Sequence, residues 1–74
     1  MTYTYPTPSD LDRMTVEAIA ALGVGNSRSV FDWVVENYRA AVSPRDCGQS
    51  LKRNAEAGRV IRHGKNAAAK HTLA

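Results

Sequence analysis

Apolar side chains recur every three or four residues over the first third of the chain, the spacing that gathers side chains on one face of an α-helix. This first stripe consists of Leu11, Met14, Ala18 and Leu22. Thr7 offers a hydroxyl N-cap in front of it, and Pro8 suits the first helical position because proline has no N–H to leave unpaired. Gly23 and Gly25 supply residues at which helices commonly end. The pattern predicts a first helix between Thr7 and Gly23.

A second apolar stripe predicts a helix over roughly residues 28–39. Its members are Val30, Trp33, Val34 and Tyr38. Either Asn26 or Ser27 can provide the N-cap, since both side chains carry an oxygen that accepts from the first backbone N–H groups. The sequence leaves this choice open.

The signal that starts the first helix is repeated at Ser43 and Pro44, followed by an acid at Asp46. The apolar stripe behind it is narrow and consists of Cys47, Leu51 and Ala55. Gly58 provides the stop. A third helix is therefore predicted from about residue 44 to the residues before Gly58.

The last segment predicts a β-hairpin. Residues 59–62 have the alternation of a short strand, residues 63–66 the composition of a turn, and residues 68–73 a weak, alanine-rich returning strand. Three helices and a terminal hairpin, in that order, predict a winged helix-turn-helix, a mainly α fold with a small β-hairpin. We expect residues 1–6 to form an N-terminal arm and residues 7–74 one winged-helix domain.

Charge changes this picture, because it is divided unevenly along the chain. Residues 43–74 carry seven Lys or Arg and two acids, a net charge of +5, whereas residues 1–42 carry three bases and five acids, a net charge of −2. A basic helix followed by a basic hairpin is typical of proteins that grip a phosphate backbone. The asymmetry predicts double-stranded DNA as the partner.

Particular side chains of the basic half have the chemistry for this task. Arg and Lys neutralise phosphates, while Gln and Asn can pair with adenine in the major groove. The third helix offers Arg45, Gln49, Lys52 and Arg53 on its polar face, with Asn54 at the margin, and the hairpin offers Arg62, His63, Lys65, Asn66 and Lys70. The alternative for both sets is a solvated polar face that binds nothing.

A different function is indicated by the second helix. Phe31, Val35 and Tyr38 form another apolar stripe, and a small domain can seldom bury two stripes on one helix. If exposed, this stripe predicts a homodimer or a protein partner, and the chain would be a small phage-type inhibitor or adaptor of a host complex. If helix two packs on two sides, the stripe is core.

Other classes are disfavoured by the sequence. His63 and His71 have no further ligand at metal spacing, Cys47 belongs to an apolar stripe, and no catalytic triad or phosphate-binding glycine loop occurs. We therefore expect no enzyme, metal, cofactor or small-molecule substrate. The lone cysteine and the absence of an apolar run of membrane length lead us to expect an intracellular protein, cytoplasmic, nucleoid-associated or, in a eukaryote, nuclear.

Several motifs, taken in order, resemble the globular domain of linker histones. They are residues 5–10 at the entry to helix one, 18–22 at its end, 25–30 and 33–38 on helix two, and 50–53 with 57–61 on helix three and the first strand. The resemblance covers about residues 5–74 and implies a winged helix that contacts DNA. Gly48 stands where the family has a basic residue, and no lysine-rich tail follows. These departures favour a compact bacterial or phage-type transcription regulator over a chromatin protein.

Overall fold

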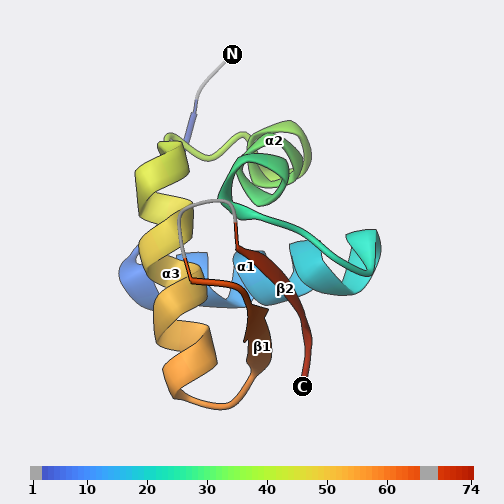
Figure 1. Ribbon diagram of the computed structural model, residues 1–74. Coiled ribbons are helices and arrows are strands. Elements are labelled where there is room, and N and C mark those ends of the chain that lie inside the picture. The colour runs from blue at the N-terminus through green and yellow to red at the C-terminus, as the bar shows by residue number, and fades with distance from the viewer. Residues whose placement is uncertain (1–2, 66–68) are drawn as a thin grey trace.

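The computed structural model describes residues 3–65 and 69–74. Over these residues three helices precede a two-stranded antiparallel hairpin, as Figure 1 shows. The elements are α1 (Pro8–Leu22), α2 (Ser27–Tyr38), α3 (Pro44–Glu56), β1 (Val60–His63) and β2 (Lys70–Leu73). The predicted fold class is confirmed, and the arrangement is compatible with a winged helix.

Each helix begins where a side-chain oxygen replaces missing backbone partners. Thr7 accepts from the Asp10 N–H at the start of α1, and Ser43 and Asp46 form a reciprocal capping box at the start of α3. At α2 the open choice falls on Asn26, which shares a capping box with Ser29. Because Asn26 is the N-cap, α2 begins one residue earlier than predicted, at Ser27.

The first strand of the hairpin begins and ends one residue later than the sequence predicts. Gly58 adopts φ 78°, a left-handed conformation that costs glycine little, and the chain then enters β1 at Val60. His63, predicted to lie in the turn, is the last residue of β1 and pairs with Lys70. The predicted returning strand begins at Ala68, which lies outside the described residues, and β2 itself begins at Lys70.

Two isolated bridges attach the remaining segments. Gly25, in the connection between α1 and α2, exchanges backbone hydrogen bonds with His71 of β2, at 3.0 and 2.7 Å. The hairpin therefore has a one-residue third partner that joins it to the helices. At the other end of the molecule the N-terminal arm is held by Thr4, which pairs in parallel with Ala40 after α2.

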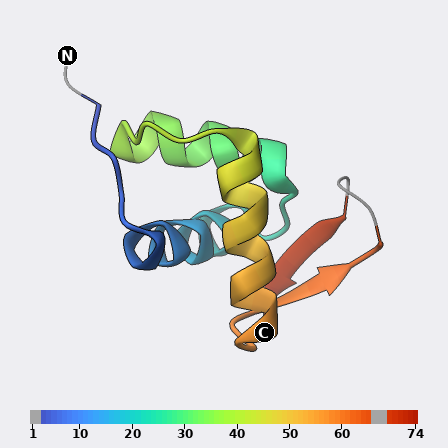
Figure 2. The same ribbon diagram turned by 90° about the vertical axis from the view of Figure 1, so that its left-hand side faces the viewer.

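The core lies where the three helices meet. Figure 2 shows α1 and α2 one above the other, with α3 crossing both and the hairpin on the far side of α3 from the N-terminal arm. Buried side chains from all three helices and β1 form one cluster, whose largest fully buried members are Ile19, Leu51, Val30 and Val34, with Val60 joining from β1. This packing fixes the face that α3 turns outward.

Candidate nucleic-acid interface

A groove of about 500 Å³ lies between the exposed face of α3 and the inner face of the hairpin. Arg45 and Lys52 line it from α3, and Arg62 lines it from β1. Gln49 contributes a neutral polar side chain on the α3 side. Among the described residues that line this groove there is no Asp or Glu. The structure thus brings together four of the ten residues predicted to contact DNA.

Helix and strand geometry explain why these four residues converge. On α3 the positions turned into the core are Cys47, Ser50, Leu51 and Asn54, so Arg45, Gln49 and Lys52 are left on the outward side of the helix. On the hairpin, Arg62 pairs directly with His71 and shares one face of the sheet with Val60. Val60 and His71 are buried, which turns this face towards the helices.

The other basic residues of the hairpin do not line the groove. His63 and Lys70 pair with each other, and by strand alternation they lie on the opposite face from Arg62. His63 Nε2 lies 2.9 Å from Thr72 Oγ1 on that face. Lys65 is exposed after the end of β1, and Asn66 lies outside the described residues. The hairpin therefore presents cations on two faces rather than one.

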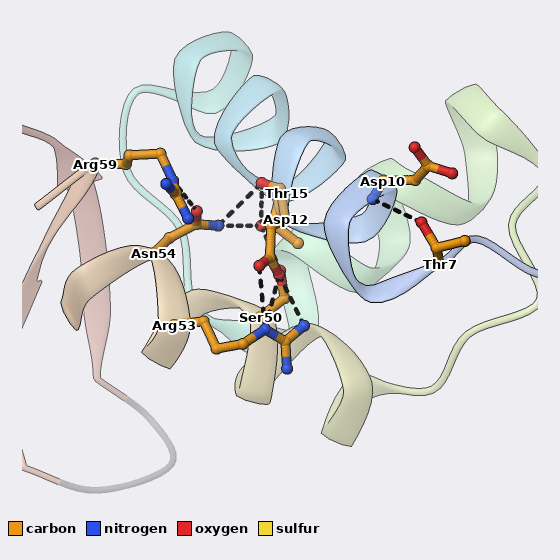
Figure 3. A network of polar contacts seen from close by, with 8 residues as sticks. All are labelled: Thr7, Asp10, Asp12, Thr15, Ser50, Arg53, Asn54 and Arg59. Carbon is orange, nitrogen blue, oxygen red and sulfur yellow. Dashed lines mark hydrogen bonds and ion pairs between the residues drawn. The ribbon is translucent and has the colours of Figure 1, made fainter. Parts of the chain in front are cut away.

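Arg53 is bound to a carboxylate of the same molecule, as Figure 3 shows. Its Nη2 and Nε donate to Asp12 at 2.7 and 3.1 Å, and Ser50 Oγ donates to the same carboxylate at 2.6 Å. The Asp12 side chain is only 16% exposed. Burial alone would raise the pKa of Asp12, but these hydrogen bonds from Arg53 and Ser50 outweigh it and the pKa lies below its ordinary value. Arg53 therefore clamps α3 to α1, and we leave it out of the proposed phosphate contacts.

The prediction that Asn54 lies at the margin of the exposed face is wrong. Asn54 is fully buried, its Nδ2 donates to Thr15 Oγ1 and to the Asp12 carbonyl, and its Oδ1 accepts from Arg59 Nε at 2.6 Å (Figure 3). All of its hydrogen-bonding groups face the protein, so it has none to offer a base. Helix one supplies the partners, and the periodicity of helix three alone gives no sign of them.

His71 lines the groove although it was not among the residues predicted to contact DNA. It is 6% exposed, lines the groove beside Arg62, and its Nδ1 has no hydrogen-bond partner among the described residues. Burial lowers the pKa of His71, the charges of Arg62 and His63 lower it further, and the Gly25 backbone opposes them. Hairpin register could have suggested burial, since His71 shares a face with Val60, but the bridge to Gly25 could not be foreseen.

The apolar stripe predicted as a protein interface is half-buried. Phe31 and Tyr38 pack against the core, and Tyr38 also contacts Trp33 with ring centroids 6.0 Å apart. Arg28 covers the Phe31 ring at 5.6 Å from its centroid. Val35 is also partly buried. Helix two is thus packed on more than one side, the interpretation that makes most of the stripe structural.

Cys47 is a packing group. Burial raises the pKa of its thiol to about 11, and Asp46 adds to the shift, so the thiol is protonated at neutral pH. Over residues 3–65 and 69–74 no three potential metal ligands gather at one point. Within the same residues, no helix has both the length and the apolar character needed to cross a membrane.

Comparisons of the chain with family models, with curated proteins and with solved structures find no significant match. The function of the protein is therefore inferred from the groove and from the charges around it.

Proposed function

We propose that this protein binds double-stranded DNA, largely through the phosphate backbone. The observation that carries the proposal is the groove itself, where cations from α3 and from the hairpin meet with no carboxylate among the described lining residues. Coulombic attraction to a polyanion is strongest where like charges from different elements converge. A net charge of +3 on the whole molecule acts in the same direction.

In this proposal α3 enters the major groove and the hairpin lies along the backbone beside it. Arg45 and Lys52 neutralise phosphates from the helix, Arg62 does so from the inner face of the hairpin, and Lys65 and Lys70 reach the flanking backbone. This division follows from their exposure on the two elements. Three helices followed by a hairpin is the order of elements that the resemblance to linker-histone globular domains implies. Relationship to that family is part of the proposal.

Little sequence specificity is expected. Asn54 is buried and Arg53 is held by Asp12, so on α3 the neutral base-reading side chain that stays exposed is Gln49. Each well-formed bidentate contact to a base supplies about 1–3 kcal/mol of discrimination. One glutamine gives a weak preference at most, which suits an architectural or broadly acting regulator.

Fluorescence anisotropy with a random-sequence duplex at several salt concentrations tests the proposal. Five cations that each release about 0.9 counterions give a slope of log K against log[salt] of about −4 to −5. A slope near zero, or no binding at low salt, contradicts the proposal.

A matched pair of double variants locates the contact. Lys52→Ala with Arg62→Ala removes two groove cations and should reduce the magnitude of the slope by about 2. Arg13→Ala with Arg28→Ala removes the same charge from residues that pair with Asp10 and Asp32 outside the groove. An equal loss of affinity in both double variants would mean that net charge, and not the groove, binds DNA.

The protein-interaction alternative retains one supporting feature, the partial exposure of Phe31, Val35 and Tyr38. Light scattering of the purified protein with and without DNA separates the two functions. A dimer that dissociates on Val35→Glu, in a protein that leaves random duplex unbound, would favour the interaction module.

A further inference from the structure

The groove has the dimensions and lining of a site for a small ligand as well as for a phosphate backbone. Its volume of about 500 Å³ falls within the roughly 300–1,000 Å³ that small-molecule sites occupy. Pro44, Leu51 and Ala69 give it apolar walls, which a sugar–phosphate backbone does not require. Cationic groups beside apolar walls suit a ligand that combines a charged group with a flat apolar body.

Positive charge around the groove comes from side chains of α3 and β1 and from the N-termini of α2 and α3. Arg45 and Lys52 lie on α3 and Arg62 lies on β1. The groove also includes Ser27 and Pro44, the first residues of α2 and α3, so two helix N-termini border it. The positive ends of helix dipoles favour a phosphate at such a place.

Ser27, the first residue of α2, lies against Gly48 of α3. A Cβ added at Gly48 would lie 3.5 Å from Ser27 Cβ, an ordinary contact distance, so α2 begins directly against this turn of α3. Both residues line the groove. Ser27 and Gly48 are small residues, so this part of the groove wall leaves room for a ligand beside the N-termini of α2 and α3.

His71 forms the wall of the groove beside Arg62. It is more than nine-tenths buried, it lines the groove, and its Nδ1 has no hydrogen-bond partner in the part of the chain that the structure describes. A buried ring nitrogen without a partner is costly and uncommon. Nδ1 itself is shielded from solvent, so a ligand in the groove packs against the His71 ring and does not reach this nitrogen.

We propose that this groove binds a mononucleotide-sized organic phosphate, with the phosphate group among Arg45, Lys52 and Arg62 and the flat ring against Leu51, Ala69 and His71. The protein holds this molecule as a ligand and not as a substrate. One consequence rests on the proposed function: ligand and DNA backbone need the same cations, so each excludes the other from the groove.

Titration with adenosine 5′-monophosphate at constant ionic strength, followed by amide chemical shifts in NMR spectra of the full chain, tests the site. Saturable shifts at the Gly48, Ala69 and His71 amides with Kd of about 1 mM or tighter are expected. Adenosine and inorganic phosphate should each bind at least about tenfold more weakly, because each lacks one of the two recognised parts. Equal affinity for inorganic phosphate overturns the apolar part of the site.

Two variants with the same change of charge decide whether the groove is the site. Arg62→Ala should weaken mononucleotide binding about tenfold, whereas Lys70→Ala, on the opposite face of the hairpin, should leave it unchanged. Lys52→Ala provides a second measurement from α3 if Arg62→Ala unfolds the hairpin. Equal losses in the Arg62 and Lys70 variants overturn the proposal.

Separate measurement of duplex binding keeps the two proposals apart. In one outcome the protein binds duplex DNA, but its amide shifts do not saturate at a mononucleotide concentration about ten times the expected Kd. The ligand site is then absent and the proposed function stands. Mononucleotide binding without duplex binding supports the site and removes the function. Where both bind, the mononucleotide should displace the duplex, and simultaneous binding would contradict the shared groove.

Discussion

At the scale of single residues, the polar contact between α1 and α3 shows how neighbouring side chains acquire different tasks. Lys52 faces the groove, Arg53 is held by Asp12, and Asn54 is buried against Thr15. Successive residues of a helix point about 100° apart, so three consecutive polar residues reach three different environments. Side-chain chemistry alone does not distinguish them.

Asn54→Ala tests the structural role of the buried amide. The substitution removes the hydrogen bonds of Asn54 with Thr15, with the Asp12 carbonyl and with Arg59, so we expect the unfolding free energy to fall by about 2–3 kcal/mol. Gln49→Ala, on the exposed face of the same helix, should change it by less than about 0.5 kcal/mol. Urea denaturation measures both.

The same two variants separate structure from DNA contact. Among folded molecules Asn54→Ala should keep its affinity for duplex DNA, since the amide does not reach the surface. A selective loss of DNA affinity at unchanged stability would show that Asn54 contacts DNA after all.

At the scale of elements, the two glycines nearest the helix starts respond differently to a methyl group. Gly48 lies within α3, where an added Cβ meets only Ser27 Cβ at 3.5 Å. Gly48→Ala should therefore stabilise the protein by about 0.5–1 kcal/mol, because glycine loses more backbone entropy than alanine in a helix. Thermal unfolding followed by circular dichroism measures the change.

Gly25 provides the contrasting control. An added Cβ there would lie 3.0 Å from Ser29 Oγ, 3.2 Å from Ile19 Cδ1 and 3.3 Å from Val30 Cγ2, all in a packed region. Gly25→Ala should destabilise the protein by about 1–3 kcal/mol. If Gly25→Ala leaves stability unchanged or raises it, the close approach at Gly25 is not present in solution.

At the scale of the whole molecule, stability should depend on pH through two groups with lowered pKa values, the buried His71 and the partly buried Asp12. For His71 the folded state favours the neutral ring, so its contribution is complete above pH 6.5 and is lost as the pH falls below that value. For Asp12 the folded state favours the carboxylate, so its contribution is complete above pH 3.8 and is lost below it. Acid should therefore lower the free energy of unfolding in two pH ranges.

Chemical denaturation between pH 8 and pH 3 measures these two contributions. As the pH falls just below 6.5, His71→Gln should lose less stability than the parent protein. As the pH falls below 3.8, Asp12→Asn should lose less stability than the parent protein. Profiles that run parallel to that of the parent protein would show that neither group is linked to folding.

Much of the architecture follows from local signals. Thr7 and Ser43 were predicted as helix N-caps and are confirmed, because a cap depends on a hydroxyl a few residues from the N–H that it accepts from. The hairpin was predicted from the glycines and the short strands beside them, with β1 placed one residue too early. The start of α2 was left between Asn26 and Ser27, since either side chain can cap, and in the structure Asn26 caps it through a capping box with Ser29.

The site was only partly foreseen, since its members are far apart in the sequence. Gln49 and Lys52 were identified because a single helix face determines their exposure, and the structure brings both to the groove. Gly48 and His71 were not counted as groove residues, because their places depend on the contact with α2 and on the bridge to Gly25. The ion pair of Arg53 with Asp12 was not predicted, because it depends on the contact between α3 and α1.

By itself the sequence determined the elements, their order, the apolar stripes and the concentration of positive charge in the second half, since periodicity, capping and charge are properties of neighbouring residues. Only the tertiary structure decided which cations remain in the groove, which one is clamped by Asp12, and that Asn54 and His71 are buried. These outcomes require α1, α3 and the hairpin to meet in space. Contacts between residues about 40 positions apart, such as Asp12 with Arg53, leave no local pattern from which they could be predicted.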